Sequence, residues 1–321
     1  MRTQRVIPLP ERREQRVSND AAHRPPVLRV AGLGKRYRRT WALRDCSLAV
    51  PAGRVVAVVG PNGAGKTTFL QLTVGLLTAT EGTVEVFGEP VGQRPEALRR
   101  VAFMAQDKPL YDRFTVAELL ELGRRLNPGW DGALAEQRLA ALRIPLDRRA
   151  GRLSGGQQAQ VALTLAVAKR PDLLVLDEPL ANLDPLARHD VMRALMTAVA
   201  DSEMTVLLSS HVVSDLADTC DWLIVLNGGR IQVSGELEDL LENHQVLSGP
   251  VELADGLAAR LPVLQDSRTD RQATLVARTG PARPPLDPRW TARTVTLEEL
   301  VLAYLRSPDA AALPRPALIR T

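Results

Sequence analysis

Residues 54–68, RVVAVVGPNGAGKTT, decide the fold of this chain. Residues 54–59 form a short run rich in β-branched side chains, which is typical of a strand buried on both faces of a sheet. A glycine-rich stretch follows, and residues 69–77, FLQLTVGLL, carry apolar side chains at helical spacing. The sequence therefore predicts a strand, a glycine-rich turn and a helix in direct succession.

The glycine-rich turn matches the phosphate-binding pattern G-x-x-x-x-G-K-[ST], in the strand–turn–helix context that this pattern requires. Glycines let backbone N–H groups converge on phosphate oxygens, and the helix N-terminus adds partial positive charge. Lys66 is predicted to reach the β- and γ-phosphates, and Thr67 to offer its hydroxyl to Mg²⁺. The residues predicted to bind the nucleotide are Gly60, Pro61, Asn62, Gly63, Ala64, Gly65, Lys66, Thr67 and Thr68. The motif indicates binding of a nucleoside triphosphate and leaves the enzyme family open.

A second apolar run, residues 173–176 (LLVL), ends in Asp177 and Glu178. A carboxylate at the end of a buried strand can hold Mg²⁺ or its waters, so Asp177 is the predicted metal residue. Glu178 is then placed to orient or deprotonate an attacking water.

Strand and helix patterns alternate along most of the chain, which predicts an α/β core with a largely parallel sheet. Thr115 with Glu118 forms a predicted capping box and Asp131 a second helix start, so residues 107–170 are predicted to be mostly helical. Asp184 before a proline predicts the start of another helix. Further strands are expected at residues 27–37, 83–88, 101–106, 205–209 and 222–226, the last leading into an Asn-Gly hairpin turn.

The composition of the 321 residues is that of a globular protein, with 45% hydrophobic and 24% charged residues. The net charge is +4, and residues 1–27 hold six arginines against three acidic residues, so the rest is nearly neutral. With only 11 aromatic residues as well, no nucleic-acid partner is expected. Cys46 and Cys220 are expected to be reduced, partly buried thiols. No apolar run is long enough for a membrane span, and no signal peptide is evident.

The sequence Leu153-Ser-Gly-Gly-Gln lies between the phosphate-binding loop and the Asp-Glu strand. This order resembles ATP-binding cassette (ABC) ATPases, and the resemblance covers about residues 28–240. It implies a P-loop core with a parallel sheet, a β-rich N-terminal subdomain and an inserted helical subdomain. It also implies hydrolysis of ATP with Mg²⁺ by a transport-coupled ATPase.

The resemblance assigns roles to further residues, each at a position that matches a motif of the family. Tyr37 resembles the aromatic residue that stacks on adenine, and Gln106 the glutamine that contacts Mg²⁺ and the attacking water. His211 resembles the histidine that contacts the γ-phosphate and helps to hold Glu178 in line. Asp184 resembles the acidic residue of the loop between protomers, although Asn182 replaces the usual glycine there. His189 and His244 match nothing in the family and are expected to be solvated or packed.

The signature residues also imply an assembly. In this family Ser154, Gly155, Gly156 and Gln157 close on ATP that is held by the opposite protomer, which requires a head-to-tail dimer. The absence of a span implies a separate transmembrane permease, which would keep the chain at the cytoplasmic face of the cell membrane. The helical region most resembles bacterial exporter-type cassettes. A soluble ABC ATPase acting on nucleic acid or ribosomes is the alternative, although such chains usually carry two cassettes or a long coiled coil. A catalytically silent cassette is a further alternative, but the residues for hydrolysis are present.

Four segments are expected in all: a flexible basic tail over residues 1–26, the ATPase domain over 27–243, a small α/β appendage over 244–306, and a second tail over 307–321. Within the appendage, residues 251–261 are expected to contain a short helix and residues 273–280 a strand. Thr296 and Glu299 predict a capping box for a last helix. A regulatory or dimer-stabilising role is expected for this appendage.

Overall fold

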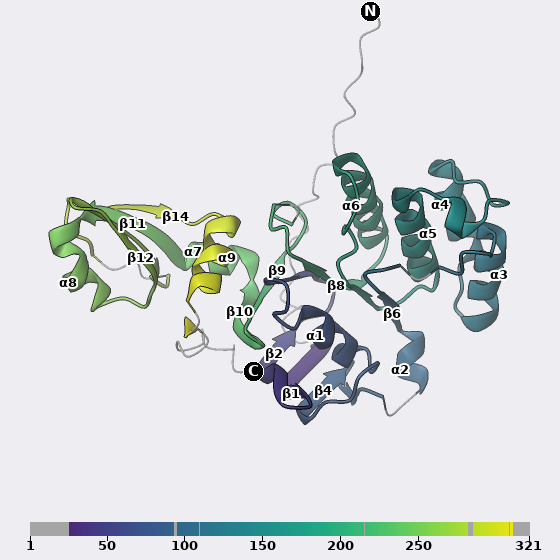
Figure 1. Cartoon of the computed structure of the whole chain (residues 1–321), viewed down its shortest axis with the longest axis horizontal. Coiled ribbons are helices and arrows are strands. Elements are labelled where there is room, and N and C mark those ends of the chain that lie inside the picture. Colours follow the sequence, from purple (N-terminus) through teal and green to yellow (C-terminus); the bar gives the residue numbers. More distant parts are fainter. Residues whose placement is uncertain are drawn as a thin grey trace, which may run out of the picture.

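A mainly parallel six-stranded sheet forms the centre of the computed structural model (Figure 1), which describes residues 26–92, 95–108, 110–214, 216–281, 285–307 and 309–310. Most of the two expected tails therefore lies outside the described residues. In sheet order the strands are β10 (Arg230–Glu236), β9 (Trp222–Asn227), β3 (Val55–Val59), β8 (Thr205–Ser210), β7 (Leu173–Leu176) and β6 (Val101–Met104). Only β10 runs antiparallel to its neighbour. Every residue of β3, β7 and β8 is buried, which confirms the predicted α/β core.

A four-stranded antiparallel sheet packs against this centre. Its strands, in order, are β2 (Thr40–Val50), β1 (Leu28–Tyr37), β4 (Glu81–Val86) and β5 (Glu89–Pro90). Helix α1 (Lys66–Thr73) contacts both sheets, and the short helix α2 (Pro95–Arg99) precedes β6. The helix expected over residues 69–77 ends at Thr73, because Gly75 turns the chain with a φ of +76°.

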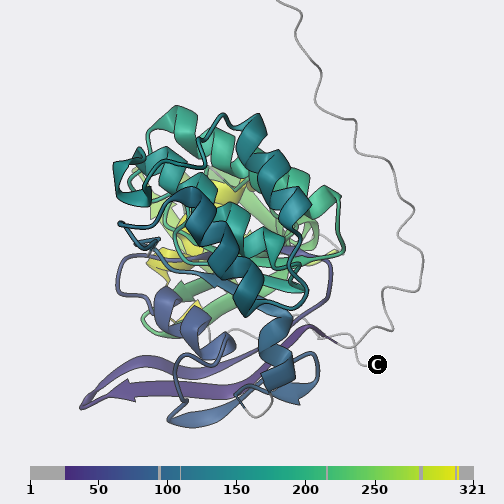
Figure 2. The same ribbon diagram turned by 90° about the vertical axis from the view of Figure 1, so that its right-hand side faces the viewer.

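Three helices form the layer that is inserted between β6 and β7: α3 (Val116–Leu126), α4 (Gly132–Ala141) and α5 (Gly155–Ala168). The predicted capping box of Thr115 and Glu118 and the N-cap at Asp131 are confirmed. Helix α5 contacts both α3 and α4 on one side and α6 (Pro185–Ala200) on the other. Figure 2, which views the molecule from the side of these helices, shows the teal helices in front and the purple hairpin of β1 and β2 below them.

The C-terminal part is a second antiparallel sheet with helices on it. Its strands, in order, are β12 (Val263–Arg268), β13 (Gln272–Arg278), β11 (His244–Pro250) and β14 (Thr291–Thr294). Helix α7 (Leu237–Glu242) leads into it, and α9 (Leu297–Arg306) begins at the predicted capping box of Thr296 and Glu299. The short helix expected within residues 251–261 is confirmed as α8 (Ala254–Ala258), and a 3₁₀ turn, Val251–Leu253, precedes it.

Helix α9 belongs to the main hydrophobic core. Its residues Leu300, Val301 and Tyr304 are buried in the same cluster as Val225 and Val233 of the central sheet. Cys46 and Cys220 are both unbridged and buried, as expected. Among the helices of the described residues, none combines the length and the apolar character needed to cross a membrane.

Candidate functional site

The register of three parallel strands brings the predicted site residues together. Val59 of β3 lies opposite Ser210 of β8, and Leu176 of β7 lies opposite Leu208 of β8. The residues that follow these strand ends therefore leave the sheet at the same carboxyl edge. In a parallel α/β sheet this edge is where ligands bind.

The phosphate-binding loop turns away from β3 where only glycine fits. A Cβ on Gly60 would stand 2.2 Å from the carbonyl oxygen of Leu226, which is a backbone atom of the neighbouring β9. Gly65 has a φ of +104°, and a Cβ on it would stand 2.6 Å from the carbonyl oxygen of Ala42. Helix α1 begins directly after Gly65, so its first N–H groups point into the loop.

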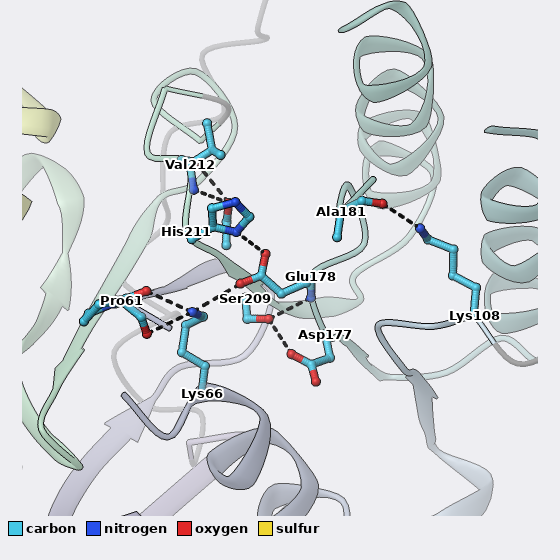
Figure 3. A network of polar contacts seen from close by, with 11 residues as sticks. Pro61, Lys66, Lys108, Asp177, Glu178, Ala181, Ser209, His211 and Val212 are labelled. Carbon is cyan, nitrogen blue, oxygen red and sulfur yellow. Dashed lines mark hydrogen bonds and ion pairs between the residues drawn. The ribbon is translucent and has the colours of Figure 1, made fainter. Parts of the chain in front are cut away.

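Lys66 lies across this loop with its side chain only 7% exposed. Its Nζ donates to the carbonyl oxygen of Gly60 at 2.9 Å and to that of Pro61 at 3.4 Å. The same Nζ lies 3.2 Å from Oε1 of Glu178, whose side chain is 9% exposed (Figure 3). The basic residue of the loop and the acidic residue after β7 thus form a buried ion pair.

Three residues hold Glu178: Lys66, Ser209 and His211. Its backbone N–H donates to Oγ of Ser209 at 2.8 Å, and its Oε2 lies 2.8 Å from Nδ1 of His211. Ser209 in turn donates its hydroxyl hydrogen to Oδ1 of Asp177 at 2.7 Å, which links the two acidic residues (Figure 3). Glu178 also has a left-handed φ of +45°, a conformation that costs a non-glycine residue about 1 kcal/mol. The side chain is therefore positioned by its neighbours against a local backbone preference.

The oxygen donors at this edge fit a magnesium ion that arrives with a nucleotide. Asp177 supplies a buried carboxylate, and Thr67 supplies an exposed hydroxyl at the start of α1. Within the described part of the chain no group of three or more His, Cys, Asp or Glu side chains could hold a metal ion. Mg²⁺ is usually bound by one or two protein oxygens together with phosphates and water, which matches this sparse donor set.

Three other residues expected at the site, Tyr37, Gln106 and Asp184, are exposed. Tyr37 ends β1 with 46% of its surface exposed, and Lys35 Nζ lies 5.3 Å from the centroid of its ring. Gln106 is exposed in the turn that follows β6. Asp184 accepts a hydrogen bond from the backbone of Ala187 at 2.9 Å and so confirms the predicted N-cap of α6.

The signature residues form the exposed beginning of α5. Ser154 accepts a hydrogen bond from the N–H of Gln157, and the Gln157 side chain accepts one from the N–H of Ser154, which completes a capping box. A Cβ on Gly156 would stand 3.0 Å from that of Ala187, so the start of α5 lies close against α6. Ser154 and Gly155 are exposed, so the helix N-terminus is accessible from outside this chain.

Two residues of the site were not predicted from the sequence. Ser209 joins Asp177 to the backbone of Glu178, and its only sequence signal was a pair of serines that closes the buried run at residues 205–210. Lys108 donates to the carbonyl oxygen of Ala181, just beyond Glu178, and had no signal. The expectation for His244 is confirmed, since it is packed in the C-terminal part, and His189 is exposed.

A cavity of about 540 Å³ lies at the opposite, amino edge of the sheet, where Pro171, Asp172 and Met204 precede β7 and β8. Its charged side chains are already paired, Arg100 with Asp172 and Arg170 with Asp131. It therefore offers no convergent polar groups like those around Lys66.

Fold and site together define a P-loop ATPase with a helical layer inserted between two strands of its sheet. The family described as ABC transporter matches residues 43–181. The chain is 36% identical to the Nod factor export ATP-binding protein I of Cupriavidus pinatubonensis, over 68% of this chain and 69% of that one. It is 37% identical to the thiamine import ATP-binding protein ThiQ of Shigella flexneri, over 61% of this chain and 86% of that one.

Among solved structures, an ATP-binding subunit of an ABC transporter superimposes with a TM-score of 0.60 and 30% identity, covering 67% of this chain and 91% of that one. The chain belongs to the ABC transporter family, as an ATP-binding, ATP-hydrolysing subunit.

Proposed function

We propose that the chain hydrolyses ATP at the edge formed by Lys66, Asp177, Glu178 and His211, and thereby powers export through a separate membrane permease. The observation that supports this most directly is the position of Glu178. Its carboxylate lies between the ammonium of Lys66 at 3.2 Å and the imidazole of His211 at 2.8 Å. A base held between two such groups, directly beside a phosphate-binding loop, is suited to orient a water and accept its proton.

Each residue then has a defined role. The loop amides and Lys66 bind the phosphates, and Tyr37 lies against the base of the nucleotide. Thr67 and Asp177, with Gln106, would hold a magnesium ion, which would supply positive charge against the charge that develops on the phosphates. Glu178 takes a proton from the attacking water, and His211 holds Glu178 through its Nδ1.

A head-to-tail dimer is part of the proposal. The exposed N-terminus of α5, with Ser154, Gly155, Gly156 and Gln157, is a ready anion site for ATP on a second protomer. Asp184 is exposed directly before α6, where it would face that protomer. Because one chain carries one loop and one signature, two chains complete two sites.

Export, rather than import, is the finer part of the proposal. The matched relatives are named for both directions, as the Nod factor and thiamine proteins illustrate. Support for export comes from the helical region between Asn127 and Gln157, which resembles exporter cassettes. The C-terminal part also suits an exporter, since exporter ATPases often end in an extra domain. The permease would hold the chain at the cytoplasmic face of the membrane.

The deciding experiment replaces Glu178 and then examines the assembly. Glu178→Gln keeps the size of the side chain but removes the base, so we expect turnover to fall at least 100-fold while ATP still binds. Size-exclusion chromatography of this variant should show a dimer with ATP and a monomer without it. Undiminished turnover would refute Glu178 as the base. Co-purification of the full chain from membranes, followed by transport in vesicles of known orientation, tests the permease and the direction.

A further inference from the structure

The loop that follows β6 reaches across to the turn that follows β7. Lys108, two residues beyond Gln106, has a left-handed φ of +48°, and its side chain points toward that turn. Its Nζ donates a hydrogen bond to the carbonyl oxygen of Ala181 at 3.0 Å (Figure 3). This contact joins two loops that lie 73 residues apart in the sequence.

The carbonyl group that Lys108 holds belongs to a tightly built turn. The N–H of Ala181 donates to the carbonyl oxygen of Glu178 at 3.0 Å, so the two residues are coupled through the backbone. Asn182 follows with a φ of +62°, and Asp184 then caps α6. Displacement of the Ala181 carbonyl would therefore move Glu178 at one end of the turn and Asp184 at the other.

The charge on Lys108 is not explained by an ion pair. Among the ion pairs of the described residues, none includes Lys108. Lys108 is half-buried and donates to a backbone carbonyl, and such a charge-assisted hydrogen bond is stronger than a neutral one.

We propose that Lys108 is a positioning residue for ATP hydrolysis, which fixes the turn from Glu178 to Asp184 relative to the loop that carries Gln106. Figure 3 shows Lys108 away from Lys66 and His211, and its hydrogen bond is to the backbone of Ala181, so we expect it to act on the reaction through that turn. This inference rests on the role proposed above for Glu178. Its predicted signature is a loss of kcat with little change in KM, since the nucleotide-binding loop is untouched.

The chain contains a matched control for this proposal. Lys169 is also half-buried, and it donates to the carbonyl oxygens of Leu98 at 2.8 Å and Val101 at 2.6 Å. Those contacts lie at the amino edge of the sheet, away from Glu178. Lys169→Met therefore removes the same kind of contact from a place where it cannot position the base.

The test compares Lys108→Met, Lys108→Arg and Lys169→Met in the full chain by steady-state ATP hydrolysis and thermal melting. We expect Lys108→Met to lower kcat at least about tenfold with KM changed less than threefold, because small misplacements of catalytic groups are this costly. Lys108→Arg, which keeps a charged donor, should recover most of the loss. Lys169→Met should lose comparable thermal stability but keep kcat within twofold.

The proposal would be overturned by a Lys108→Met variant with kcat within twofold of the natural chain, or by an equal loss of kcat in Lys169→Met. If Lys108→Met does not fold, Lys108→Gln is judged by the same criteria. Turnover retained by Glu178→Gln would instead refute the proposed function, so the two failures are distinguishable.

Discussion

The buried histidine of the C-terminal part predicts a specific dependence of stability on pH. His244 is 1% exposed, and its Nδ1 lies 2.6 Å from the carbonyl oxygen of Leu240. Because a carbonyl only accepts, Nδ1 carries the hydrogen, and Nε2 accepts the hydroxyl hydrogen of Tyr304 at 2.9 Å. Burial lowers the pKa of His244 from 6.5 to about 4 and raises the pKa of Tyr304 to about 12.

The sign and the size of the effect follow from the pKa of His244. Between pH 6.5 and 4 the unfolded chain binds a proton that the folded chain does not, so this group stabilises the fold at high pH and loses that contribution as pH falls. The full difference of about 2.5 pKa units corresponds to about 3 kcal/mol, of which about 2 kcal/mol is lost between pH 8 and pH 5.

The assay is urea unfolding of the natural chain, His244→Phe and His189→Ala at pH 8 and pH 5. Replacing His244 lowers stability at pH 8, since Tyr304 loses its partner, but it should shrink the drop in unfolding free energy between the two pH values by about 2 kcal/mol. The exposed His189 is the control and should leave the drop unchanged. An equal drop in the natural chain and His244→Phe would refute the reasoning.

Three further predictions concern the nucleotide site. Lys66→Ala should weaken ATP binding at least about tenfold in a titration, because a charge-assisted contact to phosphate is worth about 1.5–3 kcal/mol, and unaltered affinity would contradict the assignment of the loop. Gly60→Ala places a Cβ 2.2 Å from the Leu226 oxygen, so we expect a comparable loss of ATP affinity and a lower melting temperature, whereas Gly256→Ala, which has open space inside a helix, should keep the ATP affinity and should not lower the melting temperature. Ser209→Ala leaves the backbone N–H of Glu178 without its acceptor and should lower kcat about tenfold with ATP affinity kept. The control is Ser210→Ala, which should hydrolyse ATP normally, because the Ser210 hydroxyl bonds to the backbone of Val212.

The parts of the fold that the sequence predicted are those fixed by local chemistry. Thr115, Asp131, Asp184 and Thr296 all cap helices where expected, because each cap depends only on residues up to three positions away. Buried strands were recognised from their apolar runs for the same reason. The end of α1 was misjudged because the apolar spacing continues through Gly75, while the backbone turns there.

The contacts that sequence reasoning missed are all between distant segments. Ser209 meets Asp177 because β8 lies beside β7 with Leu208 opposite Leu176, and no local pattern contains the order of strands in a sheet. Lys108 meets Ala181 for a similar reason, since their loops leave neighbouring parallel strands at the same edge. The family resemblance proposes which residues carry the chemistry, while Ser209 and Lys108, which position them in our proposal, were found only in the structure.

The hairpin of β9 and β10 connects the C-terminal part with the phosphate-binding loop. The carbonyl oxygen of Leu226 in β9 bounds the space at Gly60, and the N–H of Gly229 in the hairpin turn donates to Ala64 of the loop at 3.2 Å. In the same turn Asn227 donates through Nδ2 to the carbonyl oxygen of Leu305 in α9 at 2.9 Å. Helix α9 also packs in the main apolar core. A displacement of α9 would therefore be transmitted to the backbone of the phosphate-binding loop through the β9–β10 hairpin. The C-terminal part therefore contacts the hairpin that packs against the phosphate-binding loop, and so helps to hold the nucleotide site in place.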